Sequence, residues 1–123
     1  MSAKEIDEIG LTEANRLAMQ RAVDQIKLDK DIVIDGNINY LDHVEGTKAV
    51  IDADDSHPEV MAASIVAKVA RDQYMELLDN AMPGYNFSSH KGYGTRLHSD
   101  SLDKKGISSV HRSSYAPIAK YLR

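Results

Sequence analysis

The stretch IVIDG at residues 32–36 decides the fold class, because a run of β-branched residues passes directly into an acidic turn. Three consecutive β-branched residues predict a short buried strand, and the Asp-Gly pair predicts its end. A second short strand is predicted at residues 49–51 (AVI), again followed by acidic residues, DADD at 52–55. Both predicted strands therefore end in carboxylates.

Apolar residues at helical spacing precede the two strands. Ser2 and Glu5 fit a capping box that opens a short helix, and Gly10 fits the end of that helix. A longer helix is predicted from its N-cap candidate Thr12 to about Leu28.

The longest predicted helix follows the second strand. It begins at residues 56–59, with Pro58 in its first turn, and runs to about Ala81. A shorter helix is predicted at residues 96–105, and a last turn after Pro117. The residues of the long helix that we expect in the core are Tyr74, Leu77 and Leu78.

The order of helices and strands indicates an α/β layer architecture in a single domain over residues 1–123. Two short strands make too small a sheet to bury two long helices. We therefore expect that strands of a partner chain, or strands that precede this sequence, complete the sheet. An apolar strand with a free edge also predicts self-association.

Composition and charge are those of a soluble globular protein, with 42% hydrophobic and 28% charged residues. The chain has no cysteine and no apolar run near the roughly 20 residues that span a bilayer, so we expect a cytoplasmic protein without a membrane partner. Residues 1–83 carry 8 Lys and Arg against 17 Asp and Glu, whereas residues 84–123 carry 7 against 2. This basic C-terminal region fits phosphate binding or an ordinary solvated surface.

The carboxylates at the ends of the two strands predict a cation site. Ligands of open α/β sheets gather at the carboxyl ends of the strands, where Asp35 would meet the acids of residues 52–55. Clustered carboxylates repel one another unless a positive charge lies between them, and Mg²⁺ or Mn²⁺ prefers oxygen ligands. The alternative is that each Asp simply favours a turn. A phosphoacceptor Asp would require a larger parallel sheet.

The stretch SSHKGYGTRLH at residues 88–98 is polar and pliable, yet it carries a tyrosine between two glycines. Tyr93 has little core to fill there, so we expect an external ligand to lie against it. Ser64, Lys68 and Asp72 share one helical face, either as a salt-bridged surface stripe or as a place for substrate phosphates. Zinc is not expected, because the spacing of three further histidines is not that of a metal site: His90, His98 and His111.

Five segments together resemble ribonuclease HII, the type 2 ribonuclease H family. They are SAKEIDEIGLTEANRLAMQRAV, IVIDG, ADDSHPEVMAASIVAKVARD, PGYNFSSHKGYGTRLH and VHRSSYAP, in the family's order and with similar spacing. The resemblance covers essentially all of the chain. It implies a ribonuclease-H-like fold and a two-metal endonuclease, using Mg²⁺ or Mn²⁺. The implied substrates are RNA–DNA hybrids and single ribonucleotides embedded in DNA.

The resemblance also implies roles for individual residues. Two of the family's four metal-binding catalytic acids match Asp35 and Asp54. The tyrosine of its K-G-Y-G-T motif, which stacks on the sugar beside the RNA–DNA junction, matches Tyr93. Further candidates for substrate binding, near its phosphates, are Lys91, Ser64 and Lys68.

Two departures from the family pattern bear on catalysis. The lysine that the family places before Ala53 is Asp52 here, which adds a negative charge beside the expected metal site. The Asp-Glu-x-Gly-Arg-Gly motif, which supplies the other two acids, is absent from the chain. We therefore expect an N-terminally truncated, incomplete ribonuclease-H-like fold without its first three strands, inactive by itself. The alternatives are a non-catalytic nucleic-acid-binding remnant and a plain α/β interaction module.

Overall fold

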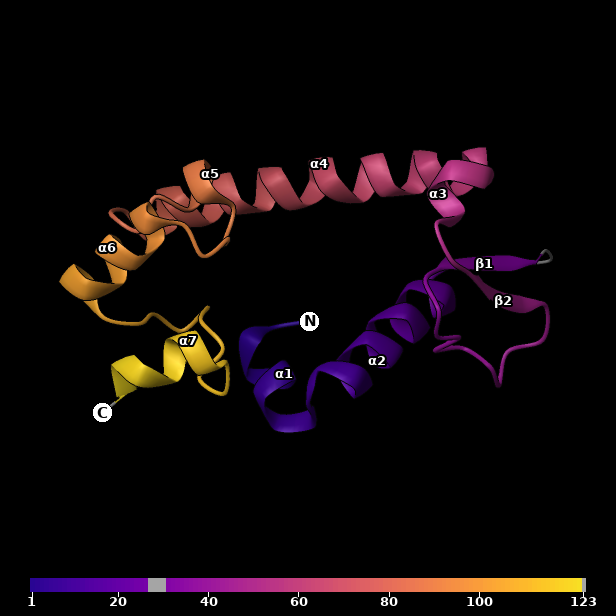
Figure 1. The fold of residues 1–123 in the computed structure, drawn as a ribbon, viewed down its shortest axis with the longest axis horizontal. Helices are drawn as coiled ribbons and strands as arrows, with labels where there is room; N and C mark the ends of the chain where they lie inside the picture. The colour runs from indigo at the N-terminus through magenta and orange to yellow at the C-terminus, as the bar shows by residue number, and fades with distance from the viewer. Residues whose placement is uncertain (27–30, 123) are drawn as a thin grey trace. The chain divides into compact units, whose positions relative to one another are not determined.

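The computed structural model describes residues 1–26 and 31–122, and the chain divides into two compact units, residues 1–64 and 65–123. Its elements, in chain order (Figure 1), are α1 (Ala3–Ile9), α2 (Leu11–Asp24), β1 (Ile32–Asp35), β2 (Thr47–Val50), α3 (Ala53–Ser56), α4 (Pro58–Ala81), α5 (Phe87–His90), α6 (Arg96–Lys105), α7 (Ala116–Ala119) and a 3-10 helix (Lys120–Leu122). The fold is therefore mixed α/β, with a two-stranded parallel sheet.

The first unit opens with two helices joined at a glycine. The predicted capping box of α1 is present, because Glu5 N–H donates to Ser2 Oγ at 3.2 Å and Ser2 N–H donates to the Glu5 carboxylate at 2.7 Å. Gly10, at φ +78°, ends α1 and also begins α2, so the prediction that Thr12 caps α2 is wrong. A glycine in this conformation turns the chain at once and leaves no linking residue between the helices to supply a side-chain cap.

α2 packs along α1 and ends at Asp24, while the predicted end near Leu28 lies outside the described residues. Ala14 is its buried residue. Arg21 ties the two helices together through an ion pair with Glu5 at 2.8 Å.

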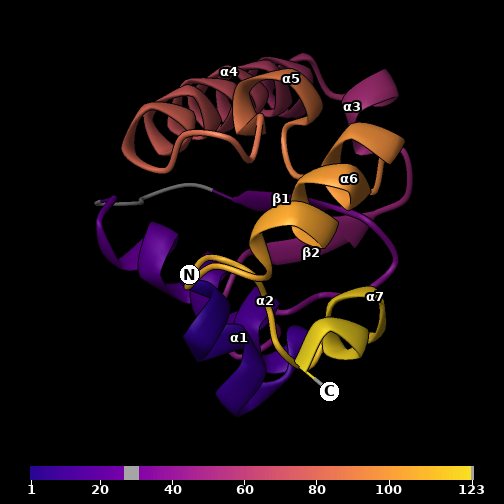
Figure 2. The ribbon, with the colours of Figure 1, turned by 90° about the vertical axis from the view of Figure 1, so that its left-hand side faces the viewer.

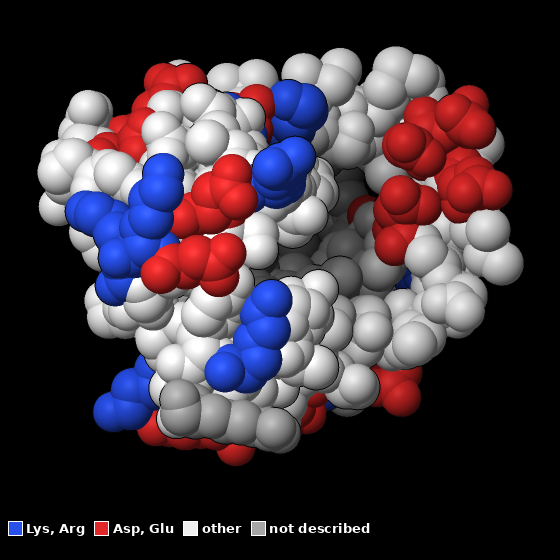
Figure 3. Space-filling view, turned by 60° about the vertical axis from the view of Figure 1, so that its left-hand side comes forward, with Lys and Arg blue, Asp and Glu red and all other residues white. Residues whose placement is uncertain are grey.

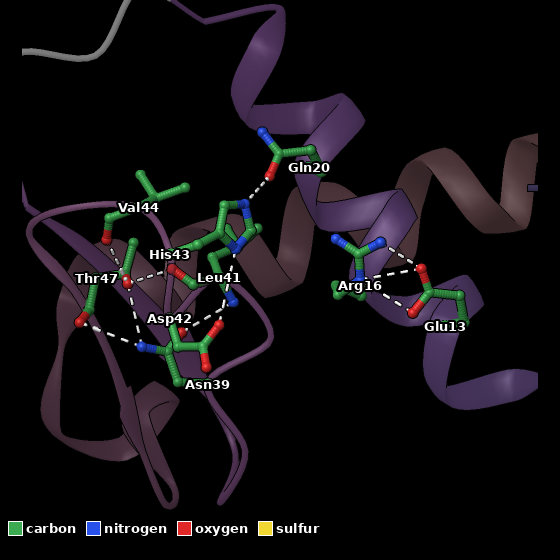
Figure 4. Close-up of polar contacts among 9 residues, drawn as sticks. All are labelled: Glu13, Arg16, Gln20, Asn39, Leu41, Asp42, His43, Val44 and Thr47. Atoms are coloured by element: carbon green, nitrogen blue, oxygen red, sulfur yellow. Dashed lines mark hydrogen bonds and ion pairs between the residues drawn. The ribbon is translucent and has the colours of Figure 1, made fainter.

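The loop between the two strands is held by its own polar groups and by α2 (Figure 4). The Thr47 hydroxyl lies 2.7 Å from the Leu41 carbonyl, and the Asn39 amide donates to that hydroxyl at 3.1 Å. The His43 ring lies 2.7 Å from the side-chain oxygen of Gln20 on α2. The residues that make these hydrogen bonds lie around Leu41, which is 1% exposed.

β1 and β2 pair in parallel, with Asp35 opposite Val50 (Figure 2), which confirms the predicted pairing. The second strand, at residues 47–50, begins two residues and ends one residue earlier than predicted, and Ile51 lies in the following turn with 68% of its surface exposed. The reason is local, because Asp52 adopts a left-handed backbone, at φ +51°, that ends the extended segment.

The core of the second unit lies between the C-terminal half of α4 and the elements that follow it. Tyr85 and Phe87 stack with their ring centroids 5.2 Å apart. α5, which the sequence did not predict, carries Phe87 into this core (Figure 2), whereas α6 and the turn after Pro117 lie where they were predicted. The buried cluster consists of Met75, Tyr85, Phe87, Leu102 and Ile118.

α4 follows its predicted bounds, but the core predicted along it is partly wrong. Leu78 packs against the buried cluster, whereas Tyr74 is 57% exposed and Leu77 is 66% exposed. Each of these two lies one residue, about 100° of helix rotation, before a residue that faces the core. Within the described part of the chain, no helix has the length and hydropathy that a membrane span requires.

Candidate active site

Asp35 and Asp54 follow the two parallel strands at the same edge of the sheet. Asp35 is the last residue of β1, and Asp54 lies in α3, the short helix that follows β2. The Ala53 N–H donates to Asp35 Oδ1 at 2.9 Å, and Ala53 itself is completely buried. This bond fixes the direction of the Asp35 carboxylate and ties it to the residue beside Asp54.

Asp52 lies at the N-terminus of α3 and shapes the turn that brings Asp54 to the sheet edge. Its backbone is left-handed, and its carbonyl accepts a hydrogen bond from the Asp55 N–H at 3.1 Å. Asp and Asn enter this conformation more readily than residues with long side chains. An aspartate at residue 52 therefore suits the left-handed turn before α3.

The oxygen donors at the sheet edge suit a hard divalent cation in kind but not in number. Asp35 and Asp54 offer carboxylate oxygens, the ligands that Mg²⁺ and Mn²⁺ prefer, yet such ions take about six ligands. Within residues 1–26 and 31–122, no group of three or more His, Cys, Asp or Glu side chains is arranged to hold a metal ion. Within the described residues, two carboxylates are therefore too few to complete a site for such an ion.

Tyr93 lies in the loop between α5 and α6, and its side chain is 69% exposed. The loop begins at Lys91, whose backbone is left-handed, and Gly92 follows at φ +85°. A Cβ at Gly92 would lie 3.3 Å from the guanidinium of Arg71, so this position favours glycine for both conformation and space. The loop therefore presents the tyrosine ring outward on a backbone that packs closely against α4.

Lys91 and Arg71 fasten this loop to α4. The Arg71 guanidinium donates to the Lys91 carbonyl at 2.8 Å. The Lys91 ammonium donates to the Asp72 carbonyl at 3.2 Å and pairs with Glu76 at 3.1 Å, and the Lys91 side chain is 21% exposed. Lys91, predicted to bind substrate phosphates, thus already has two partners on α4.

The stripe on α4 has its polar groups paired along the helix. Ser64 donates to the Met61 carbonyl at 2.8 Å, and Lys68 pairs with Asp72 at 2.7 Å. The hydrogen bond to Asp72 raises the pKa of Lys68. The Lys68 side chain is 74% exposed.

The three histidines of the second unit lie together, which their spacing in the sequence did not predict. The His90 and His98 rings stack with centroids 4.1 Å apart, and His98 Nε2 lies 3.0 Å from His111 Nε2. They pack around Phe87 through tertiary contacts that the sequence gives no signal for.

Lys and Arg lie beside Asp and Glu over part of the surface drawn in Figure 3, and a separate group there consists mostly of Asp and Glu. Part of the positive charge of the C-terminal region is paired, as in the contact of Arg96 with Asp100 at 4.0 Å. The Lys105 ammonium donates to the Pro83 carbonyl at 2.6 Å. Net charge alone therefore overstates the cationic surface available to a phosphate backbone.

A family model described as Ribonuclease HII matches residues 1–118. The chain belongs to the ribonuclease HII family. The mixed α/β structure with its parallel strand pair is consistent with part of a ribonuclease-H-like fold, as the motifs implied.

Three curated relatives, each named Ribonuclease HII, align with nearly all of the chain. The protein of Acinetobacter baylyi is 43% identical over 119 residues, covering 96% of this chain and 63% of the relative. That of Shewanella loihica is 44% identical over 124 residues (98% and 60%), and that of Vibrio parahaemolyticus is 42% identical over 122 residues (98% and 57%). The chain thus spans about three-fifths of the length of these relatives.

Proposed function

We propose that this chain supplies two metal-binding carboxylates and a substrate platform to an endonuclease that cleaves the RNA strand of RNA–DNA hybrids and ribonucleotides embedded in DNA. The observation that supports the proposal is the hydrogen bond from Ala53 N–H to Asp35 Oδ1, which joins Asp35 to the residue beside Asp54, in a chain of the ribonuclease HII family.

The proposed chemistry is hydrolysis of a phosphodiester with Mg²⁺ or Mn²⁺. When bound, such ions activate the attacking water and stabilise the leaving oxygen. The part of this chain is to hold carboxylate oxygens in fixed directions: Asp35 through Ala53 N–H, and Asp54 through the short helix α3. Because two carboxylates are too few for two dications, we propose that the remaining ligands come from outside the described residues.

The proposed substrate platform is the loop of Tyr93 with the neighbouring Lys68. An exposed aromatic ring on a firmly held loop can stack on a nucleotide, which contributes roughly 1–3 kcal/mol. Lys68 pairs with Asp72, whose carbonyl accepts from Lys91 of the loop, and its side chain is mostly exposed, so its ammonium can meet a phosphate. Lys91 and Ser64 would first have to exchange their present partners.

The proposal is tested by a cleavage assay on a duplex with one embedded ribonucleotide, with Mg²⁺ or Mn²⁺. Two samples are compared, the 123-residue chain and the same chain joined to the portion of the Acinetobacter baylyi relative that it does not match. We expect cleavage by the joined protein and none by the chain alone. Cleavage by the chain alone would show that two carboxylates suffice. A joined protein that is folded yet inactive, beside an active relative, would contradict the proposed function.

A non-catalytic nucleic-acid-binding role is the second candidate, favoured by the exposure of Tyr93 in a basic region. Binding to a hybrid would then weaken as the salt concentration rises. In a plot of the logarithm of the binding constant against that of the salt concentration, each phosphate contact contributes about −0.9 to the slope. With roughly three or four contacts the slope is near −3. Binding with this slope but without cleavage in the joined protein supports this role, and the absence of salt-dependent binding argues for a plain interaction module.

We also propose that the isolated chain self-associates. Within the described residues β1 pairs with β2 alone, so one edge of this apolar strand has no partner strand. The second unit also exposes Ile65, Val66 and Leu77 of α4, each by more than half. Sedimentation across a concentration series tests this proposal, and a monomer at every concentration would contradict it.

A further inference from the structure

The hydrogen bonds around the three histidines determine which nitrogen of each ring carries the proton. The Gly92 N–H donates to His90 Nδ1 at 3.1 Å, so that nitrogen is an acceptor. The proton of a neutral His90 is therefore on Nε2, which donates to the Tyr85 carbonyl at 2.7 Å.

The same reasoning runs from His111 to His98. The Ser108 N–H donates to His111 Nδ1 at 3.0 Å, so the proton of His111 is on Nε2. That Nε2–H donates to His98 Nε2 at 3.0 Å. The proton of His98 is consequently on Nδ1, which donates to the Tyr93 carbonyl at 3.0 Å.

Each ring is thus neutral, and the free lone pair of each ring faces a donor. A proton added to His98 would fall on Nε2, directly against the Nε2–H of His111. A proton added to His111 would fall on Nδ1 and displace the Ser108 N–H, leaving the Ser108 hydroxyl, 2.8 Å away, as the acceptor. Protonation of His98 or His111 therefore breaks a hydrogen bond that the neutral cluster makes.

Two of these bonds reach the loop that carries the exposed tyrosine. His90 accepts from the residue before Tyr93, and His98 donates to the carbonyl of Tyr93 itself. The Thr95 N–H donates to the same carbonyl at 2.9 Å. The backbone on both sides of the tyrosine is therefore held by imidazoles that are buried, since His90 is 5% and His98 is 7% exposed.

We propose that His98 and His111 are positioning residues that hold Tyr93 for the substrate through a relay of neutral imidazoles, His111 to His98 to the Tyr93 carbonyl. The relay makes the position of the tyrosine depend on pH. This inference rests on the proposed function only for the role of Tyr93, because the relay itself is a property of the folded chain.

The surroundings of His98 and His111 favour their neutral forms. Burial lowers the pKa of both rings, and neighbouring histidine rings lower both further, although the backbone of Tyr93 acts in the opposite direction on His98 and that of Ser108 on His111. The charged groups around the cluster are Asp79 of α4, which interacts with His90, and Lys105 of α6, which lies 5.5 Å from the Tyr85 ring centre. On the loop itself the charged groups are Lys91 and its partner Arg71.

Nitrogen-15 NMR of the 123-residue chain tests the relay directly. At neutral pH we expect His98 protonated on Nδ1, and both His90 and His111 protonated on Nε2. His98 and His111 should titrate with midpoints below about 6.5. His98 protonated on Nε2, or midpoints at or above that value, would overturn the proposal.

The link to the loop is tested in the same titration. The Thr95 N–H shares the Tyr93 carbonyl with His98, so its amide signal should move with the midpoint of His98. His98→Phe keeps a ring but removes both hydrogen bonds of His98, so the Thr95 amide should shift at neutral pH and lose its titration. His98→Asn offers a donor near the former Nδ1 and should restore the neutral-pH signal without the titration. His57→Asn, a histidine outside the cluster, should leave the Thr95 signal and its titration unchanged.

Binding of a labelled RNA–DNA hybrid connects the relay to function. His98→Phe should weaken binding about five- to tenfold, the effect of one lost hydrogen bond, and adding Tyr93→Ala should weaken it little further. Wild-type affinity for His98→Phe, beside a weakened Tyr93→Ala, would overturn the positioning role. Absence of hybrid binding by the wild type would refute the proposed function, while the NMR titration, which needs no variant, still decides the relay.

Discussion

The two units hold their candidate functional residues by different means. In the first unit, Asp35 and Asp54 lie within twenty residues of one another in the sequence. Asp35 ends a strand and accepts a backbone N–H, and Asp54 follows the left-handed turn at Asp52. In the second unit, α4, α5, α6 and the segment around His111 together hold the loop of Tyr93. The acids are therefore carried by backbone at the ends of two paired strands, whereas the loop of the tyrosine is held by side-chain hydrogen bonds from several helices.

The difference has a consequence for mutation. Substitution of Asp35 or Asp54 in the first unit removes a carboxylate proposed to bind the metal ion and leaves the backbone at that position in place. Substitution of a buried ring in the second unit removes part of the support on which Tyr93 rests. Function and stability should separate in the first unit and change together in the core of the second.

The largest expected effect is on cleavage by the joined protein described above. Asp35→Asn and Asp54→Asn should each lower cleavage about a thousandfold, because a correctly held cation supplies several kcal/mol of transition-state stabilisation. Asp55→Asn, an equal change of charge in the same helix, should lower it far less. Turnover near that of the parent protein for either variant would remove that acid from the mechanism.

A large effect on stability is expected from Phe87, which is 2% exposed. Phe87→Ala should lower the free energy of unfolding by about 3–5 kcal/mol, through lost burial and the cavity left behind. Tyr74→Ala, at an exposed position of the same unit, should change it by no more than about 0.5 kcal/mol. Urea denaturation compares the two, and equal losses would mean that the buried cluster is not the core of this unit.

A smaller effect is expected from Tyr93, since its ring is exposed and its backbone carries the local hydrogen bonds. Tyr93→Ala should weaken hybrid binding about tenfold through the loss of stacking, with unfolding free energy nearly unchanged. Tyr93→Phe keeps the ring and should bind almost as the wild type does. If the phenylalanine variant binds as weakly as the alanine variant, the hydroxyl rather than the ring face contacts the substrate.

The smallest effect concerns pH. Because the pKa values of His98 and His111 are lowered in the folded chain, the unfolded chain binds more protons as pH falls below about 6.5. Their contribution to stability is therefore present above that pH and is lost as pH falls through their folded-state pKa values. Urea unfolding at pH 7.5 and pH 5.5 should show lower stability at the lower pH. His98→Asn should reduce the difference, and an equal stability at both pH values would contradict the lowered pKa values.

Periodicity and capping predicted the helices well, because their signals lie within a few residues of the boundary. The capping box of Ser2 and Glu5 and the end of α6 at Gly106 are such cases. The prediction that Thr12 caps α2 was wrong because Gly10 caps the end of α1 and the start of α2. The prediction that Ile51 lies in a strand was wrong because Asp52 turns the chain. Each failure follows from a left-handed backbone conformation that hydrophobic patterning does not report.

The candidate site, like the helices and strands, could be predicted from the sequence only in part. Asp35 and Asp54 follow strands that pair in parallel, so their shared sheet edge could be expected from the sequence. The histidine cluster could not, because it joins residues 90, 98 and 111 through tertiary packing around Phe87. The partners of Lys91 on α4 were also beyond reach, since they lie 15 and 19 residues away.

The central claim is that Asp35 and Asp54 bind the same divalent cation, and Mn²⁺ titration of the nitrogen-15-labelled chain tests it most directly. The paramagnetic ion broadens the amide signals of nearby residues. The account predicts early broadening at residues 35–36 and 53–55, and loss of that broadening in Asp35→Asn but not in Asp42→Asn, an exposed acid of the loop between the strands. Broadening centred on other acids, or unchanged broadening in Asp35→Asn, would contradict it.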